Sequence, residues 1–186
     1  RRTQHSLVMA DHGNRQVARL NEAKFTKTTL ADRYQGNRLN SPNDLVYRSN
    51  GDLYFTDPPY GLKGLNDDPA KELRQNGVYR LTRSGQLTLL TTELTFPNGI
   101  AFSPDEKTLY IANSDEKRKV WMRYDVAANG SVSHGKVFAD VTAEKEAGLP
   151  DGMKVDAQGN VYATGPAGVW VFSPEGKHLG TIKPPE

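Results

Sequence analysis

The sequence contains no cysteine among its 186 residues. Disulfide bonds, zinc–thiolate sites and thiol nucleophiles are therefore excluded. It also has no apolar run of about 18 residues, the length that a membrane-spanning helix needs. The net charge is only +2, from 24 basic and 22 acidic side chains, and the basic residues are scattered along the chain. We expect neither nucleic acid nor a membrane surface as a partner.

Several catalytic motifs are missing as well. The sequence has no Gly-x-Ser-x-Gly segment, no phosphate-binding loop and no His-Glu-x-x-His segment. These absences argue against serine hydrolases, nucleotide-binding enzymes and zinc proteases. The chain begins with Arg1 and shows no signal peptide, so we expect a processed or truncated start. The compartment is not indicated, and we expect a soluble protein of the cytoplasm or periplasm.

One short pattern is present three times. It reads Pro-Asn-Asp at 42–44, Pro-Asn-Gly at 97–99 and Pro-Asp-Gly at 150–152, each time followed by two strand-like segments. Asn43 and Asn98 are 55 residues apart, and Asn98 and Asp151 are 53 apart. Strand-rich repeats of this length are typical of a β-propeller. Because equivalent positions of successive blades surround one axis, Asn43, Asn98 and Asp151 are predicted to converge at one mouth of the channel.

Glycine-containing turns divide each repeat into two hairpins. They lie between alternating apolar segments, where tight hairpins need a positive φ; examples are 49–51 (SNG), 83–85 (RSG), 128–130 (ANG) and 157–159 (AQG). We therefore predict an all-β fold, a β-propeller in a single domain 1–186. About fifteen strands are expected in four blades, at about 1–38, 39–95, 96–145 and 146–186. Trp121, Trp170 and Tyr79 are expected to pack between blades.

The blade pattern also predicts which residues share an end of the propeller. Three pairs are expected to be neighbours at one rim, namely Asn43 with Asp57, Asn98 with Asn113, and Asp151 with Thr164. The longest connection, 58–76, opens on the same rim and carries Tyr60, and long loops in compact domains are often functional. The short hairpin turns are expected at the opposite end.

The three motif residues offer two amides and one carboxylate. Calcium prefers such oxygen ligands, and no histidine stands at the repeated positions, which argues against zinc or copper. A different interpretation is that the motifs are only turns that enter strands, because Asn, Asp, Gly and Pro are common in turns. Segment 57–60 could likewise contact substrate or form a rigid proline corner, and His12 could be a rim residue or an ordinary loop histidine.

Longer segments resemble the gluconolactonase branch of the SMP-30/gluconolactonase/luciferin-regenerating enzyme family. They are 40–44 (NSPND), 54–61 (YFTDPPYG), 97–105 (PNGIAFSPD), 149–153 (LPDGM) and 165–170 (GPAGVW). The resemblance covers nearly the whole chain in the same order. It implies a six-bladed propeller that hydrolyses sugar lactones with one divalent cation, usually calcium, although magnesium, manganese or zinc also occur as candidates. Only four blades are visible, so both ends are expected to be truncated.

The resemblance also assigns roles to individual residues. Asn98 and Asp151 correspond to metal ligands, Asp151 also to the proton-transfer residue, and Asn43 to a residue that faces substrate near the metal. Arg38 corresponds loosely to a substrate-contacting arginine. Apart from the resemblance, Asp57 and Tyr60 of the rim loop are candidates for substrate contact. The glutamate ligand that the family carries near its N-terminus has no counterpart in this sequence.

The predicted function is divalent-metal-dependent hydrolysis of a sugar lactone, with gluconolactone as the model substrate. Two alternatives stay open: a non-catalytic propeller that binds a partner at its rim, and a lactonase or phosphotriesterase of another propeller family. The identity of the lactone and the oligomeric state do not follow from the sequence.

Overall fold

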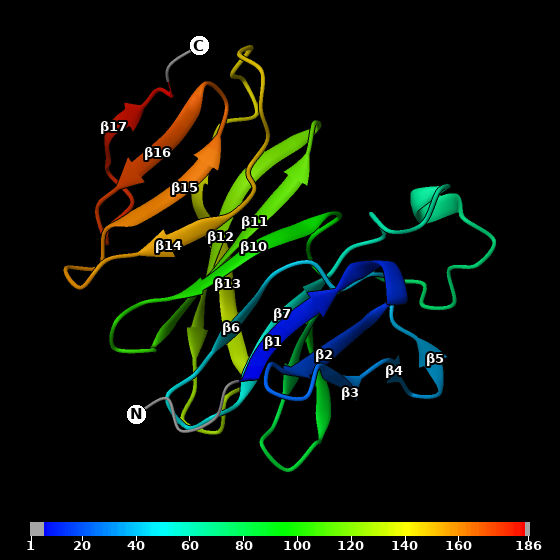
Figure 1. Cartoon of the computed structure of the whole chain (residues 1–186). Coiled ribbons are helices and arrows are strands. Elements are labelled where there is room, and N and C mark those ends of the chain that lie inside the picture. Colours follow the sequence, from blue (N-terminus) through cyan, green and yellow to red (C-terminus); the bar gives the residue numbers. More distant parts are fainter. Residues whose placement is uncertain (1–5, 185–186) are drawn as a thin grey trace.

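The computed structural model describes residues 6–184, which form four antiparallel sheets and one short ribbon (Figure 1). Blade 1 contains β1 (Ser6–Asp11), β2 (Gln16–Asn21) and β3 (Thr26–Ala31), followed by the ribbon of β4 (Arg33–Tyr34) and β5 (Asn37–Arg38). Blade 2 contains β6 (Leu45–Tyr47), β7 (Leu53–Asp57), β8 (Gly77–Leu81) and β9 (Leu87–Thr91).

Blade 3 contains β10 (Pro97–Phe102), β11 (Thr108–Asp115), β12 (Arg118–Val126) and β13 (Val132–Asp140). Blade 4 contains β14 (Met153–Val155), β15 (Val161–Gly165), β16 (Gly168–Phe172) and β17 (His178–Ile182). The only helical elements in 6–184 are two short 3₁₀ helices, η1 (His12–Asn14) and η2 (Leu65–Asp67). The prediction of an all-β fold is therefore confirmed.

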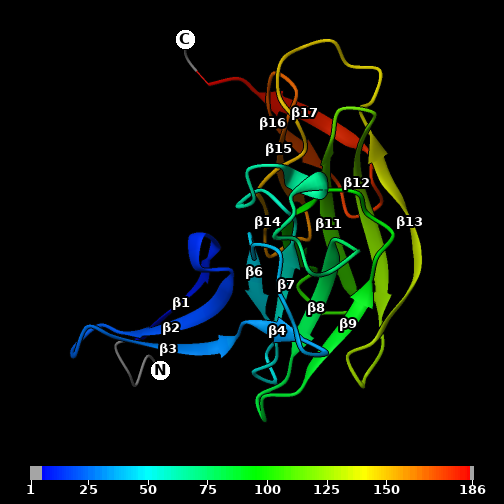
Figure 2. The same ribbon diagram turned by 90° about the vertical axis from the view of Figure 1, so that its right-hand side faces the viewer.

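In each blade the strands pair in chain order, which is the arrangement of a propeller blade. Figures 1 and 2 show the four sheets following one another, with blade 1 set at an angle beside blade 2. The described part of the chain has seventeen strands rather than about fifteen. Blade 1 has three strands instead of four, and the short ribbon β4–β5 lies between it and blade 2.

Apolar side chains between neighbouring sheets form three core clusters, one at each blade interface. Tyr79 and Trp121 are fully buried in two of them, as predicted. Trp121 meets Phe172 of blade 4 edge to face with ring centroids 5.2 Å apart. Trp170 is half-buried at the margin of the same cluster. Burial of these rings is what fixes the blades side by side.

The backbone pairing places the motif residues at one end of the blades. The Asn43 amide donates to the Thr56 carbonyl at 2.9 Å, and the Asp151 amide donates to the Thr164 carbonyl at 3.0 Å. In blade 3, Pro97 pairs with Asn113. We call this end the rim. Turns such as the one at Gly51, whose φ is 90°, lie at the other end of the same strands, which we call the hairpin end.

Among the described residues, none of the helices has the length and apolar character required to cross a membrane.

Candidate functional site

Asn43 and Asn98 touch at the rim although they come from different blades. The Asn43 Nδ2 donates to the Asn98 Oδ1 at 2.6 Å. The Asn98 Nδ2 in turn donates to the Ser114 Oγ at 2.9 Å, and the Ser114 hydroxyl donates to the Pro150 carbonyl. This hydrogen-bonded row crosses blades 2, 3 and 4 and ends at the residue before Asp151. The structure thus brings the three motif segments together, as the repeat predicts.

The third residues of the first two motifs, Asp44 and Gly99, explain how the segments come so close. A Cβ atom on Gly99 would lie 2.1 Å from the backbone oxygen of Asp151, so only glycine fits at this position. The corresponding residue of blade 2 is Asp44, whose Oδ2 accepts the Ile100 amide at 3.0 Å. Sequence reasoning missed both contacts. The sequence nevertheless carried a sign of these contacts, because aspartate or glycine directly follows Asn43, Asn98 and Asp151.

Tyr60 reaches the same row from the long loop 58–76. Its ring stacks on Phe96 with centroids 5.9 Å apart and an angle of 8° between the planes. Burial raises the pKa of the Tyr60 phenol to about 12; nearby Asp151 acts in the same direction, while hydrogen bonds with Ser114 and Asn98 oppose the rise. The phenol therefore keeps its proton at neutral pH and can donate a hydrogen bond at the rim.

Asp151 differs from its neighbours in accessibility. Its side chain is exposed, whereas Asn98 is buried and Asn43 is half-buried. Within residues 6–184, the Asp151 carboxylate forms no hydrogen bond or ion pair. An exposed carboxylate at the rim, one residue after the end of the hydrogen-bonded row, is available both to a cation and to a proton.

Asp57, a predicted substrate contact, lies inside the protein. No part of it is exposed, and its Oδ2 and Oδ1 accept the amides of Asn40 and Ser41, each at 2.8 Å. Burial raises the pKa of this carboxyl to about 7, although the two amides lower it. The sequence pattern placed Asp57 correctly at the rim end of β7, but its side chain turns into the core, not toward a ligand.

Arg38 and His12 occupy the blade 1 side of the rim. The Arg38 guanidinium donates to the Asn14 carbonyl at 3.2 Å, and its backbone amide donates to Glu72 at 2.7 Å. These contacts do not join Arg38 to the row of Asn43, Asn98 and Ser114. The His12 ring lies against Gly61, because a Cβ there would be 3.1 Å from two of its ring atoms. His12 is therefore a packed neighbour of the Tyr60 loop.

The donor set at the rim suits a hard cation. The Asp151 carboxylate supplies a charged oxygen, and Asn98 supplies an amide oxygen; Ca²⁺ accepts such ligands together with water. The Asn98 Oδ1 has two lone pairs, so it can accept from Asn43 and still face an ion. No group of three or more His, Cys, Asp or Glu in the described ranges is placed to hold a metal ion.

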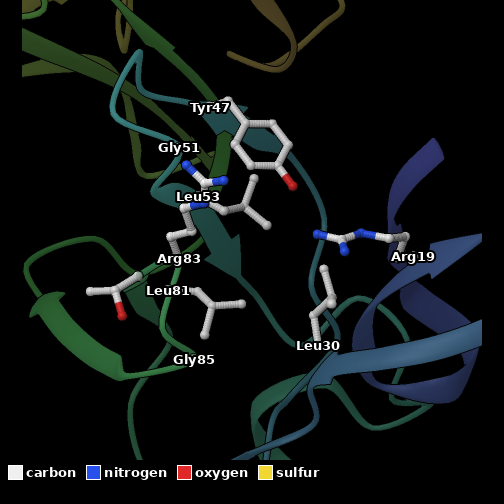
Figure 3. A pocket seen from close by; sticks show the side chains of 9 residues that line it. Arg19, Leu30, Tyr47, Gly51, Leu53, Leu81, Arg83 and Gly85 are labelled. Atoms are coloured by element: carbon white, nitrogen blue, oxygen red, sulfur yellow. The ribbon is translucent and has the colours of Figure 1, made fainter. Parts of the chain in front are cut away.

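A separate cavity of about 210 Å³ lies between blades 1 and 2, with Arg19, Tyr47 and Arg83 around leucine side chains (Figure 3). The turn residues Gly51 and Gly85 also line it. It therefore lies at the hairpin end and does not belong to the rim site.

Comparison with known proteins identifies the family of the chain. The family model described as "SMP-30/Gluconolactonase/LRE-like region" matches residues 1–186. A gluconolactonase from Zymomonas mobilis is 41% identical over 181 residues, which are 95% of this chain and 51% of that protein. The solved structure of a gluconolactonase from Xanthomonas campestris has a TM-score of 0.84 and 37% identity, covering 97% of this chain and 59% of that one.

A calcium-binding protein, regucalcin, from Agrobacterium tumefaciens has a TM-score of 0.55 and 20% identity, covering 100% of this chain and 72% of that one, which supports the fold alone. The chain spans about half the length of the curated gluconolactonase it matches. The resemblance inferred from the motifs is confirmed, and the chain belongs to the SMP-30/gluconolactonase/LRE-like family.

Proposed function

We propose that the protein carrying this chain hydrolyses a sugar lactone, with an aldonolactone such as gluconolactone as substrate, and that a divalent cation at the rim assists. The observation that carries the proposal is the hydrogen-bonded row from Asn43 through Asn98 and Ser114 to Pro150, which sets an exposed Asp151 beside it. The 41% identity to a gluconolactonase supports the choice of reaction.

Asn98 and Asp151 would hold the cation, and Ca²⁺ is the ion that their oxygens suit best. When bound, a divalent cation polarises a carbonyl oxygen and lowers the pKa of water. Magnesium, manganese or zinc could replace calcium in the laboratory, since the site offers simple oxygen donors.

Asp151 would transfer the protons during hydrolysis. Water adds to the lactone carbonyl, the bond between that carbon and the ring oxygen breaks, and an open hydroxy acid is released. The Asp151 carboxylate accepts a proton from the attacking water and returns it to the leaving ring oxygen, as a general base and then a general acid. Its exposure leaves it free to do so.

Asn43 and Tyr60 would orient the substrate. A sugar lactone presents several hydroxyl groups, and an amide and a protonated phenol can hydrogen-bond to them. Both side chains adjoin Asn98, so a substrate held by them lies beside the proposed cation ligands. Arg38 would contact substrate only after its guanidinium leaves the Asn14 carbonyl.

The full-length protein tests the proposal. Asp151→Asn keeps the shape of the side chain but removes its charge and basicity, so the rate of gluconolactone hydrolysis should fall by about 10²–10⁴-fold and added cation should not restore it. Asn98→Ala should instead weaken the binding of Ca²⁺, and excess Ca²⁺ should restore part of the rate. Proton release, corrected for spontaneous hydrolysis, measures both.

Asp125→Asn is the matched control. Asp125 is exposed and pairs with Thr108, at the hairpin end of blade 3. The Asp125→Asn variant should hydrolyse gluconolactone at the same rate as the parent. Equal rates in the parent, Asp151→Asn and Asn98→Ala, or a parent that is unaffected by a chelator, would refute metal-dependent hydrolysis and favour a binding module.

A further inference from the structure

Asp57 serves as a double acceptor for the segment that leads to Asn43. Each carboxylate oxygen holds one backbone amide, Oδ2 that of Asn40 and Oδ1 that of Ser41, both at 2.8 Å. Asn40 and Ser41 are fully buried, as Asp57 is. Only Pro42 separates them from Asn43, and its ring restricts the backbone between the two. The Asp57 carboxylate thus holds the two backbone amides that precede Pro42 and Asn43.

Ser41 joins the same segment to the loop that carries Tyr60. Its hydroxyl donates to the Pro58 carbonyl at 2.6 Å and accepts the Gly61 amide at 2.8 Å. These two bonds enclose Pro59 and Tyr60. A Cβ on Gly61 would lie 2.8 Å from the Cβ of Ser41, so the loop is packed directly against the Asn43 segment.

Asn40 holds the far end of the loop. Its Nδ2 lies 3.0 Å from the Asp57 carbonyl, 2.9 Å from the Gln75 carbonyl and 3.2 Å from the Asn76 Oδ1. The buried guanidinium of Arg15 adds bonds to the carbonyls of Leu39, Asn40 and Ala70, at 2.8, 3.0 and 2.9 Å. The segment before Asn43 is therefore the common anchor for both ends of the loop 58–76.

We propose that Asp57 is a positioning residue, whose buried carboxylate fixes Asn43 and, through Ser41, Tyr60 in one arrangement at the rim. The proposal rests on the proposed function for its kinetic consequence. A buried carboxylate is costly, and an apolar side chain could fill the same volume at lower cost. No neutral side chain of that size offers two acceptors to two adjacent amides. What the carboxylate supplies is orientation, which in a catalytic site affects rate strongly.

Asp57→Asn in the full-length protein is the main variant. Its amide keeps the volume of the carboxylate but replaces one oxygen with an NH2 group that only donates, so the backbone amide that faces this group loses its partner. We expect the KM for gluconolactone to rise about tenfold, because both proposed substrate contacts shift. The affinity for Ca²⁺, measured by calorimetry, should change less than threefold, because Asn98 keeps its bond to Ser114 and Asp151 lies in blade 4. A merely structural defect would weaken both together.

Ser41→Ala is the second variant, useful if Asp57→Asn does not fold. It keeps the amide bonds to Asp57 but removes both links to the loop, so it should raise KM only through Tyr60. Adding Tyr60→Phe to Ser41→Ala should then raise KM no further. If the two effects instead multiply, Ser41 does not act through Tyr60.

Nuclear magnetic resonance separates this proposal from the proposed function. The side-chain amide signal of Asn43 and the ring signals of Tyr60 should both move in Asp57→Asn and stay in place in Asp125→Asn. This holds even if the parent does not hydrolyse gluconolactone. Unmoved signals, or a loss of Ca²⁺ affinity equal to the loss of substrate affinity, would overturn the positioning role.

Discussion

Gly99 of β10 lies against the backbone of Asp151, so closely that a Cβ on Gly99 would stand 2.1 Å from the Asp151 carbonyl oxygen. The two residues belong to successive blades. Gly99 directly follows the proposed cation ligand Asn98, and Asp151 is itself a proposed cation ligand. The absence of a side chain at position 99 therefore sets the distance between Asn98 and Asp151.

Gly99→Ala should disturb the rim more than the fold. The added methyl group overlaps backbone atoms, which cannot rotate away, so blades 3 and 4 must separate at the rim. We expect Ca²⁺ affinity and the rate of lactone hydrolysis to fall at least tenfold. Gly152→Ala is the control, because no atom lies within 4 Å of a Cβ there. Equal behaviour of the two variants would contradict the close-approach argument.

Burial of Asp57 predicts a pH-dependent stability. Its pKa is about 7 in the folded chain, against an ordinary value of 3.8. A raised pKa means that the folded state binds the proton more tightly than the unfolded state does. The stability that this proton binding adds is complete below about pH 4 and is lost as the pH rises through about 7. The loss should be a few kcal/mol. Asp57→Asn should remove this part of the pH dependence in urea unfolding experiments.

The comparison at high pH is the sharpest. Above about pH 7 the parent has a charged, buried carboxylate, so the difference in unfolding free energy between the parent and Asp57→Asn should be smaller there than at low pH, while the KM of the variant stays raised. Identical pH dependence of parent and variant would mean that the carboxyl titrates normally.

The periodic part of the fold was predictable from the sequence. Glycine turns and alternating apolar residues locate the strands, and the register of the three motifs locates Asn43 and Asn98 at one rim, where the structure joins them at 2.6 Å. The reason is that strand period and repeat length are local properties, visible in one dimension.

The orientation of single side chains was not predictable in the same way. Asp57 ends a strand whose residues are all buried, so alternation gives no sign of which way it faces. Its partners, Asn40 and Ser41, lie outside any strand, and the carbonyl of Asn40 is held by Arg15 of another blade, a contact that alternation cannot predict. Blade 1 also departs from the repeat, because only three strands pair in it and the ribbon β4–β5 forms a separate two-stranded sheet.

The contact between Arg80 and Asp52 predicts a stability effect at the hairpin end. The Arg80 Nη2 and Asp52 Oδ2 are 2.5 Å apart, and the Asp52 side chain is 6% exposed. Arg80 also donates to the Asn129 carbonyl of blade 3, so it links two blades. Arg80→Met leaves a buried carboxylate without its cation and should cost about 1–3 kcal/mol of unfolding free energy, since Arg80 itself is partly exposed.

Arg83→Met is the matched control for that measurement. The Arg83 side chain is exposed, and only its backbone amide contacts Asp52. Its effect in urea unfolding should be within about 0.5 kcal/mol. The hydrogen bond from Arg80 also lowers the pKa of Asp52 against the effect of burial, so the stabilisation by the pair should diminish as the pH falls through that lowered pKa. A pair that contributes nothing would leave both variants equally stable.

Tyr60→Phe tests whether the phenol binds substrate or transfers protons. The ring stacking on Phe96 survives the change, so the melting temperature should hardly move. Because the pKa of Tyr60 is about 12, the hydroxyl stays protonated and acts only as a hydrogen-bond group. Loss of one such bond, worth about 1.5 kcal/mol, should raise the KM for gluconolactone about tenfold. The rate should keep the same pH profile between about pH 5 and pH 9, where the phenol does not titrate. A profile that loses its alkaline limb in Tyr60→Phe would instead identify the phenol as a titrating acid and would move the proton-transfer role away from Asp151.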